Sequence, residues 1–327
     1  MEIGKVPENV LKRSVFQQIR HRRPEVVLHP GVGEDCSGVE VAPGEVLVLS
    51  VDPITAADRG MGTFAVHVTA NDLASSGAEP VGVLLSILLP PGKREKYLRE
   101  LMEEIELACR GLNIEVMGGH TEVTAAVNQP VVTVTGVAKV ERDQLIATGG
   151  LQAGDELVMT KWAGMEGTAI IAAEKREKLL QTLPEELVEK AAGLLDYISV
   201  VPEAAVARNA GATAMHDVTE GGIFGALWEI GAAAGVGVTA DLAKIPIRQE
   251  TIEVCEVFGL NPYQMMSSGS LLIGCANGNR MVEELENAGI AAAVIGRATD
   301  SHDRVIVNGE EKRFLEPPGS DELYKIY

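Results

Sequence analysis

Residues 71–80 read NDLASSGAEP, and this stretch places an amide and a carboxylate among small and apolar residues. The run from Thr63 to Ser76 has the composition of a tightly packed helix, which Gly77 would end. An uncompensated charge inside such a helix is costly, because burial strips the carboxylate of its water. We therefore interpret Asp72, with its neighbour Asn71, as a candidate cation-binding position.

Strands and helices alternate on both sides of this stretch. The valine-rich runs Val46 to Val51 and Val131 to Val140 are expected to be buried strands. The run Lys93 to Arg110 is expected to be a helix, because its apolar residues recur every three or four positions. A second series of strands and helices begins after two glycines at 149 and 150. We therefore predict an α+β protein of two domains, residues 1–150 and residues 151–327.

Composition and charge exclude several classes of partner. The chain of 327 residues has 28 basic and 47 acidic residues, a net charge of −19, and aromatic residues make up 4% of it. Such a chain lacks the basic surface and the stacking aromatic residues that nucleic-acid binding uses. Its longest apolar run, Val81 to Pro91, is about half as long as a membrane helix requires. No apolar signal core follows Met1, so we expect a cytoplasmic protein that binds neither nucleic acid nor membrane.

Familiar nucleotide-binding and hydrolase motifs are absent from the sequence, which contains no GxxxxGK[ST] loop, no HExxH and no GxSxG. Instead, acidic residues stand beside glycines or at the ends of expected strands, at Asp35, Asp52, Asp72 and Glu122. Any one of them alone is most often a turn former or a helix cap. Four in one half of the chain favour a second interpretation, in which carboxylates converge on Mg²⁺ and hold phosphates without a lysine loop.

Five motifs occur in the order and at the intervals seen in the aminoimidazole ribonucleotide synthetase (AIR synthase) superfamily. They are Gly33-Glu34-Asp35, Asp52, the 71–80 stretch, Gly118-Gly119-His120-Thr121-Glu122 and His216-Asp217-Val218-Thr219-Glu220-Gly221-Gly222. From about residue 25 to about residue 300 the chain resembles this superfamily, which includes thiamine-monophosphate kinase and the hydrogenase maturation factor HypE. HypE is the member that it resembles most. The resemblance implies a two-domain AIR-synthase-like (PurM-like) fold, with an N-terminal mixed sheet that has helices on one side and a C-terminal α/β sandwich.

The resemblance also implies an ATP- and Mg²⁺-dependent enzyme that transfers the γ-phosphoryl group to an oxygen of an amide-like or small-molecule acceptor. ATP would lie in a cleft between the domains, and the N-terminal domains would pair through their sheets into a homodimer. The implied metal ligands are Asp35, Asp52 and Asp72, which would hold the nucleotide together with Asn71, Thr219, Gly221 and Gly222. The implied catalytic residues are His120, Glu122 (also a candidate metal or substrate ligand) and Asp217. A helix beginning at Gly221-Gly222 would offer free N–H groups to an anion.

The motifs on the acceptor side differ from those of HypE. His120 stands where the superfamily has an aspartate and Glu220 where it has an arginine, and no cysteine stands near Tyr327. His120 is either a substrate-contacting base or a structural histidine that satisfies a turn. The sequence leaves open whether the acceptor is a small molecule or is borne by a protein. It also leaves open whether a partner protein in hydrogenase or metallocofactor maturation takes part. The alternatives are a thiamine-monophosphate-kinase-like small-molecule kinase and a non-catalytic nucleotide-binding maturation scaffold.

The four cysteines, Cys36, Cys109, Cys255 and Cys275, are interpreted as small residues of a protein from a reducing compartment. Cys36, which follows Asp35, is expected to be buried rather than nucleophilic. Thiolate chemistry needs an accessible sulfur with a lowered pKa. We therefore expect that none of these cysteines carries a covalent carbamoyl or cyano intermediate.

Overall fold

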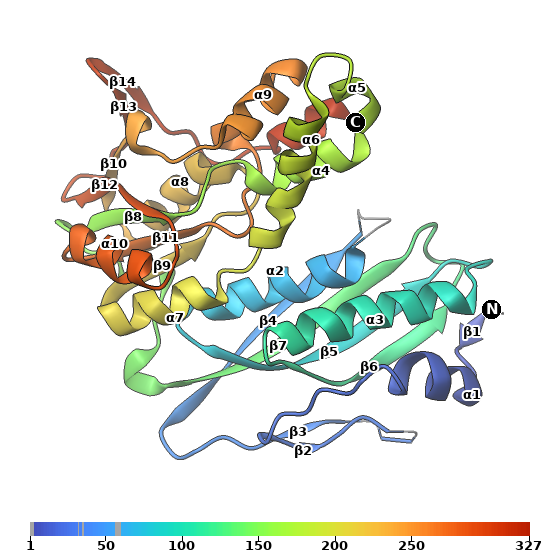
Figure 1. Cartoon of the computed structure of the whole chain (residues 1–327). Coiled ribbons are helices and arrows are strands. Elements are labelled where there is room, and N and C mark those ends of the chain that lie inside the picture. The colour runs from blue at the N-terminus through green and yellow to red at the C-terminus, as the bar shows by residue number, and fades with distance from the viewer. Residues whose placement is uncertain (1–2, 32, 35, 56–59) are drawn as a thin grey trace. The chain divides into compact units, whose positions relative to one another are not determined.

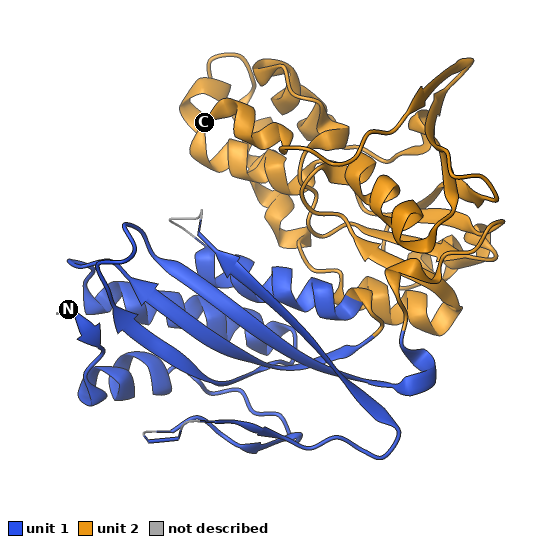
Figure 2. Cartoon of the chain, turned by 180° about the vertical axis from the view of Figure 1, so that it is seen from behind, with its two compact units in different colours: residues 1–74, 78–145 blue, residues 75–77, 146–327 orange. Residues whose placement is uncertain are grey.

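The structure is a computed structural model that describes residues 3–31, 33–34, 36–55 and 60–327 (Figure 1). Contacts within the chain divide it into two compact units (Figure 2). Unit 1 comprises residues 1–74 and 78–145, and unit 2 comprises residues 75–77 and 146–327. The sequence placed the division after residue 150, whereas the contacts place it after residue 145. That the first part binds nucleotide and forms dimers stays a prediction.

Unit 1 is built on a five-stranded mixed sheet in the order β1-β6-β5-β7-β4, in which only the pair β5 and β6 is parallel. The strands are β1 (Gly4–Lys5), β4 (Glu45–Ile54), β5 (Glu79–Leu89), β6 (Glu115–Val123) and β7 (Val131–Glu141), and β2 (Val26–Leu28) pairs separately with β3 (Gly38–Val39). The helices are α1 (Glu8–Leu11), α2 (Met61–Ser75) and α3 (Glu95–Gly111). Helices α2 and α3 lie on one face of the sheet (Figure 1), and Figure 2 shows the strands from the other face. The predicted mixed sheet with helices on one side is confirmed.

Helix α2 approaches α3 closely near its start, at Gly62. A side chain at Gly62 would place its Cβ 2.9 Å from the carbonyl oxygen of Leu101, so only glycine fits there. Helix α3 contributes the apolar stripe that the three-four spacing predicted, with Leu98, Met102 and Ile105 buried among others. At the other end of α2, where the NDLASSGAEP motif begins, Leu73 packs against Ala138 and Val140 of β7.

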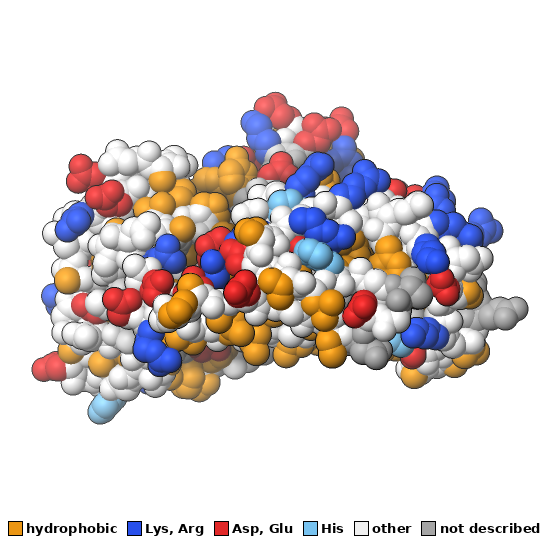
Figure 3. Space-filling view, turned by 90° about the horizontal axis from the view of Figure 1, so that it is seen from below, with side chains coloured by type: hydrophobic (Ala, Val, Ile, Leu, Met, Phe, Trp, Pro, Cys, Tyr) orange, Lys and Arg blue, Asp and Glu red, His pale blue; other side chains and the backbone are white. Residues whose placement is uncertain are grey.

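Alternation along β4 decides which of its side chains face α2. Val46 and Val48 pack with Leu73 of α2. The side chains between them point the other way and are hydrophobic but exposed, with exposed fractions of 43% for Leu47, 65% for Leu49 and 59% for Val51. Hydrophobic side chains also reach the surface on the side that carries β2 and β3 (Figure 3), where Val27 and Leu28 are exposed. Because β4 is an edge strand, unit 1 presents an apolar strip at the border of its sheet.

Unit 2 is built on a seven-stranded sheet in the order β14-β13-β10-β12-β8-β11-β9. The strands are β8 (Glu156–Thr160), β9 (Ala212–Asp217), β10 (Gly237–Asp241), β11 (Leu271–Cys275), β12 (Ala292–Thr299), β13 (Arg304–Asn308) and β14 (Glu311–Phe314). The helices are α4 (Met165–Glu174), α5 (Arg176–Leu179), α6 (Glu185–Ala192), α7 (Val201–Ala210), α8 (Gly222–Ala234), α9 (Gln249–Phe258) and α10 (Gly278–Asn287).

The sheet of unit 2 lies between α8 on one side and α7 and α10 on the other (Figure 1). Leu227 and Ile230 of α8 pack with Met159 of β8 and Leu272 of β11 in one apolar core. This arrangement is the α/β sandwich that the family resemblance implied. No helix within the described ranges is long and apolar enough to cross a membrane.

Candidate functional site

A serine hydroxyl joins two of the three predicted metal ligands. Ser50 Oγ on β4 donates a hydrogen bond of 2.6 Å to Asp72 Oδ2 on α2, and it lies 3.4 Å from Asp52 Oδ2. Both aspartates are half-buried. Because a hydroxyl has one proton, it donates to one carboxylate at a time, and the shorter contact identifies Asp72 as its acceptor. The three side chains form a small oxygen-rich cluster where sheet and helix meet.

The other predicted nucleotide ligands of unit 1 are placed less fully. Asp35 lies outside the described residues, so its part in this cluster stays a prediction. Asn71 precedes Asp72 on α2 and is completely buried. In the part of the chain that the structure describes, no three His, Cys, Asp or Glu side chains are grouped to hold a metal ion. A cation at this position would therefore meet two described carboxylates, those of Asp52 and Asp72.

Two predicted motifs lie inside strands rather than after them. β4 continues to Ile54, so Asp52 pairs with Val134 of β7 and does not end its strand. β6 continues to Val123, so His120 and Glu122 occupy strand positions as well. The alternative that His120 satisfies a turn is therefore wrong. The expectation ended both strands too early because the glycines of β6 and the proline of β4 are typical of strand ends.

His120 and Asp52 lie on opposite faces of the unit 1 sheet. The residues paired across the four strands β6, β5, β7 and β4 are, in order, His120, Ser86, Thr133 and Pro53. Paired residues share a face and neighbours along a strand alternate, so Asp52 faces α2 while His120 faces away from it. Glu122 shares the face of His120, and its Oε2 lies 3.1 Å from His120 Nε2. Within unit 1, the predicted catalytic pair is thus separated from the carboxylate pair.

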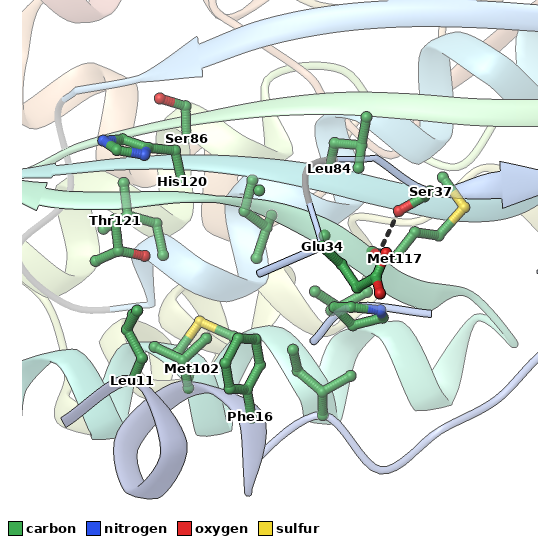
Figure 4. Close-up of a pocket in the computed structure, with 18 of the residues that line it drawn as sticks. Leu11, Phe16, Glu34, Ser37, Leu84, Ser86, Met102, Met117, His120 and Thr121 are labelled. Carbon is green, nitrogen blue, oxygen red and sulfur yellow. Dashed lines mark hydrogen bonds between the residues drawn. The ribbon is translucent and has the colours of Figure 1, made fainter. Parts of the chain in front are cut away.

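A cavity of about 680 Å³ includes His120 in its lining. Figure 4 shows His120 and Ser86 on one side of it and Leu11, Phe16 and Met102 on the other. Hydroxyl groups from β6 and β7 add to the polar part of the lining, at Thr121, Thr133 and Thr135. The lining therefore draws on both faces of the sheet, since His120 and Ser86 face away from α2 and α3 whereas Met102 belongs to α3.

Two features of the chain shape this cavity. Gly119 has a φ of 143°, and a Cβ there would lie 1.9 Å from the carbonyl oxygen of Leu85, so β6 can approach β5 only with glycine at this position. Ser37 Oγ donates a hydrogen bond of 2.5 Å to the carbonyl oxygen of Met117 and so ties the loop before β3 to β6. Cys36 in that loop is exposed and lines the cavity. The expectation that Cys36 is buried is therefore wrong.

In unit 2, the predicted glycine loop connects β9 to α8. Asp217 ends β9 and is buried, and Gly221 and Gly222 have φ values of 80° and 59° where α8 begins. Their amides are not free. Gly221 N–H donates to Asp321 Oδ2 at 2.8 Å, and Gly222 N–H donates to the Thr219 carbonyl oxygen at 3.1 Å. The expectation that the helix beginning here offers free N–H groups to an anion is therefore wrong for Gly221 and Gly222, because a carboxylate and a carbonyl of the chain already accept their hydrogen bonds.

Buried acids surround this loop, namely Glu166, Asp217 and Asp321. Glu166 Oε2 accepts a hydrogen bond of 3.1 Å from Ser268 N–H. Burial raises the pKa of Glu166, and the neighbouring charges of Asp321 and Asp217 raise it further. Burial also raises the pKa of Asp321, although three backbone N–H groups act in the opposite direction. Glu166 and Asp321 therefore hold a proton more readily than exposed carboxyls do.

Three residues of these clusters were not predicted, and they are Ser50, Glu166 and Asp321. Ser50 had a signal, because residues two apart on a strand share a face and Ser50 is two residues before Asp52. Glu166 resembles an ordinary acidic residue in the first turn of a helix. Asp321 had no signal, since it is 100 positions from Gly221 and only folding brings the two together.

Two family models match the chain in succession. The model for the N-terminal domain of AIR synthase related proteins matches residues 33–140, and the model for their C-terminal domain matches residues 152–308. The chain belongs to the AIR synthase related family. The resemblance inferred from the motifs is thereby confirmed, as is the two-domain AIR-synthase-like fold.

Among known members of this family, hydrogenase proteins are similar to the chain. A putative hydrogenase expression/formation protein of Methanocaldococcus jannaschii is 25% identical over an alignment of 336 positions, gaps included. The alignment covers 99% of this chain and 97% of the relative. Carbamoyl dehydratase HypE of Cupriavidus necator is 29% identical over 255 residues, which cover 75% of this chain and 69% of the relative. The chain is therefore a HypE-like AIR synthase related protein.

Solved structures share the fold. Escherichia coli HypE matches with a TM-score of 0.82 at 22% identity, over 98% of this chain and 100% of that one. HypE in complex with ATP matches with a TM-score of 0.78 at 19% identity, over 98% and 97% of the two chains. A HypE–HypF complex matches with a TM-score of 0.72 at 18% identity, over 83% of this chain and 90% of that one. Thiamine-monophosphate kinase of Stenotrophomonas maltophilia matches with a TM-score of 0.76 at 20% identity, over 95% and 99% of the two chains. At such low identities the matches show the fold, which HypE and thiamine-monophosphate kinase have in common.

Proposed function

We propose that this protein is an ATP- and Mg²⁺-dependent enzyme of hydrogenase or metallocofactor maturation. It would transfer the γ-phosphoryl group of ATP to an oxygen of an amide-like or small-molecule acceptor. The observation that carries the proposal is the carboxylate pair Asp52 and Asp72, joined by Ser50 at the family motif. Similarity over 99% of the chain to a hydrogenase expression/formation protein favours this function over a thiamine-monophosphate kinase activity.

The donors at the carboxylate pair suit Mg²⁺. Asp52 and Asp72 supply carboxylate oxygens and Ser50 a hydroxyl oxygen. Mg²⁺ prefers hard oxygen ligands and is commonly held by one or two carboxylates together with substrate phosphates. When bound, it would offset the negative charge of the phosphoryl oxygens. Asp35 is the third proposed ligand, and Asn71 is proposed to contact the nucleotide.

Activation of the acceptor is assigned to the face of the sheet that carries His120. An imidazole can take a proton from a hydroxyl or amide group near neutral pH, and a carboxylate beside it stabilises the cation that forms. Glu122, 3.1 Å from His120, is in place for that second role. The cavity beside His120 is the proposed acceptor site, and because the sheet separates it from Asp52 and Asp72 of the same chain, the phosphoryl group would have to come from the carboxylate pair of a second copy. Asp217 is the proposed catalytic residue of unit 2, where Thr219, Gly221 and Gly222 would contact the nucleotide.

Calorimetric titration with MgATP tests the nucleotide part of the proposal. Asp72→Asn keeps the size of the side chain but removes its charge, so we expect the affinity to fall about 100-fold. Asp143→Asn changes an exposed acid of the same unit and should leave the affinity unchanged. Equal affinities of the Asp72→Asn and wild-type proteins would remove Asp72 from the site. A wild-type protein that binds no MgATP would overturn the proposed function.

We also propose a homodimer that forms through the open face and edge of the unit 1 sheet. The support is the strip of Leu47, Leu49 and Val51 on β4, which a second copy would cover. Leu49→Lys should give monomers in sedimentation, whereas Leu107→Lys should not, because Leu107 is as exposed but lies on α3. Wild-type protein that sediments at the 34.7 kDa of one chain at micromolar concentration would contradict the dimer.

A maturation partner protein in the cytoplasm is the last part of the proposal. The HypE–HypF complex is a structure of this fold with a protein partner, which supports a protein-borne acceptor here. The net charge of −19 favours a protein over a nucleic acid as partner. Co-sedimentation with the HypF protein of the same organism should give a complex, and a nucleic acid should not compete with it. Separate sedimentation at all concentrations would contradict this partner.

A further inference from the structure

The last residues of the described chain are an integral part of unit 2. A 3-10 helix, Glu322–Ile326, follows the β13–β14 hairpin. Leu323 and Ile326 pack into the apolar core that also contains Leu179 and Met265. Leu323 is 4% exposed, which is the burial of a core residue. The segment is therefore fixed by packing, and the residue before it is held in one place.

Asp321 is that residue, and its carboxylate lies among backbone N–H groups. Its side chain is 1% exposed. Oδ2 accepts a hydrogen bond of 2.8 Å from Gly221, and Oδ1 accepts one of 2.9 Å from Leu323. A hydrogen bond from the backbone of Met266 also lowers the pKa of this carboxyl. One buried carboxylate thus connects the glycine loop, the segment before β11 and the C-terminal helix.

The glycine loop lies between two walls. A Cβ at Gly221 would lie 3.1 Å from Cβ of Pro318, and a Cβ at Gly222 would lie 2.7 Å from the carbonyl oxygens of Tyr263 and Met265. Glycines at positive φ are otherwise conformationally free, so the loop owes its conformation to these walls and to its hydrogen bonds. Without a buried acceptor, the Gly221 N–H would lose its partner, which is costly.

A second residue of the C-terminal segment binds the same loop, since the Tyr324 hydroxyl donates a hydrogen bond of 2.7 Å to Glu220 Oε1. We propose that Asp321 is a positioning residue, which holds the loop 217–222 in the conformation that presents its side chains to the ligand. Tyr324 assists it at the exposed side of the loop. The inference rests on the proposed function, in which this loop contacts the nucleotide.

The test compares two conservative variants of the same segment. Asp321→Asn keeps one acceptor oxygen but turns an NH₂ group toward a backbone N–H, so at least one of the side-chain hydrogen bonds is lost. Tyr327→Phe removes the hydrogen bond to Glu174, which the segment makes away from the loop. Both are titrated with MgATP at a temperature where circular dichroism shows them folded. We expect the Kd to rise about tenfold in Asp321→Asn and to stay unchanged in Tyr327→Phe.

Hydrogen exchange gives a second readout that needs no nucleotide. Asp321→Asn should lose protection at the amides of residues 218–225, while the strands of unit 2 keep theirs. A wild-type Kd in Asp321→Asn would overturn the positioning role and leave the proposed function standing. A wild-type protein that binds no MgATP would overturn the proposed function, and unchanged exchange in the loop would then overturn the positioning role too. Should Asp321→Asn not fold, Tyr324→Phe replaces it, with an expected rise in Kd of about threefold.

Discussion

Carboxylates gather at the candidate residues of both units, but the two units surround them differently. In unit 1, Asp52 and Asp72 are half-buried and lie around one neutral hydroxyl. In unit 2, Glu166 and Asp321 are buried and accept hydrogen bonds from backbone amides whose positions the fold fixes. A fixed amide satisfies a carboxylate permanently, whereas a hydroxyl can turn away when a cation arrives. The surroundings of Asp52 and Asp72 thus suit the metal-ligand role proposed for them, whereas Glu166 and Asp321 already have their partners within the fold.

Metal removal should give the largest contrast between the units. A ligand that binds only the folded state stabilises it by mass action, so Mg²⁺ with ATP should raise the melting temperature of the wild type by several degrees. The double variant Asp52→Asn/Asp72→Asn should lose the whole shift, and Glu166→Gln should keep it. Scanning calorimetry with and without EDTA measures this. A full shift in the double variant would place the metal elsewhere.

The pH dependence of stability should single out Glu166. Its folded-state pKa is raised above the ordinary value of 4.5, first by burial and then by Asp321 and Asp217. Its contribution to stability is therefore present below that ordinary value and is lost as pH rises through the folded pKa. Glu166→Gln can still accept from Ser268 but does not titrate. Urea unfolding at about pH 5 and at about pH 8 should show that the free energy of unfolding falls less between these pH values in the variant than in the wild type. Equal losses would contradict the assignment.

Glu25 of unit 1 should respond to pH in the opposite direction and more weakly. Hydrogen bonds from Arg23 and Lys139 lower its pKa to about 2. Its stabilisation is present above the ordinary value of 4.5 and is lost as pH falls toward 2. Glu25→Gln should lower the melting temperature near neutral pH and change little near pH 2. Added salt should shrink the difference, because the group is partly exposed. A salt-independent difference would argue for packing instead.

Replacing cysteines should have the smallest effect of all these changes on MgATP binding. Burial raises the pKa of Cys255 to about 12 and that of Cys275 to about 11, and it raises the pKa of Cys109 still further. These thiols stay protonated near neutral pH and are poor nucleophiles. Replacing exposed Cys36 by alanine should leave the MgATP affinity unchanged. Intact-protein mass spectrometry after incubation with a carbamoyl donor, its transferase and MgATP should show no adduct. An adduct mapped to any of the four would contradict this.

The fold could be predicted from the sequence because its signals are local. The apolar spacing of α3 and the glycine after α2 act over a few residues. The five motifs, which occur in a fixed order, add the prediction of the two-domain fold. Strand ends were harder, because Pro53 lies at a sheet edge and Gly119 serves the approach of β6 to β5. Both residue types usually stop strands.

The candidate site was predicted only in part, since its geometry depends on pairing and on distant contacts. That Asp52 and His120 face opposite ways follows from a register across four strands, which a single sequence does not contain. The contact between Asp321 and Gly221 joins segments far apart in the chain. Ser50 is the exception, because the two-residue period of a strand would have pointed to it beside Asp52.

The exposed strip on β4 has a consequence for how the protein behaves in solution. An edge strand of ten residues with an apolar face is a template on which other extended chains can add, and such edges lead to aggregation when nothing covers them. Pro53 limits this near one end, because it has no N–H to offer an incoming strand. A second copy that covers the strip would therefore act as a shield. Dilution, which usually keeps proteins in solution, would then expose the edge, and the most concentrated samples would be the slowest to precipitate.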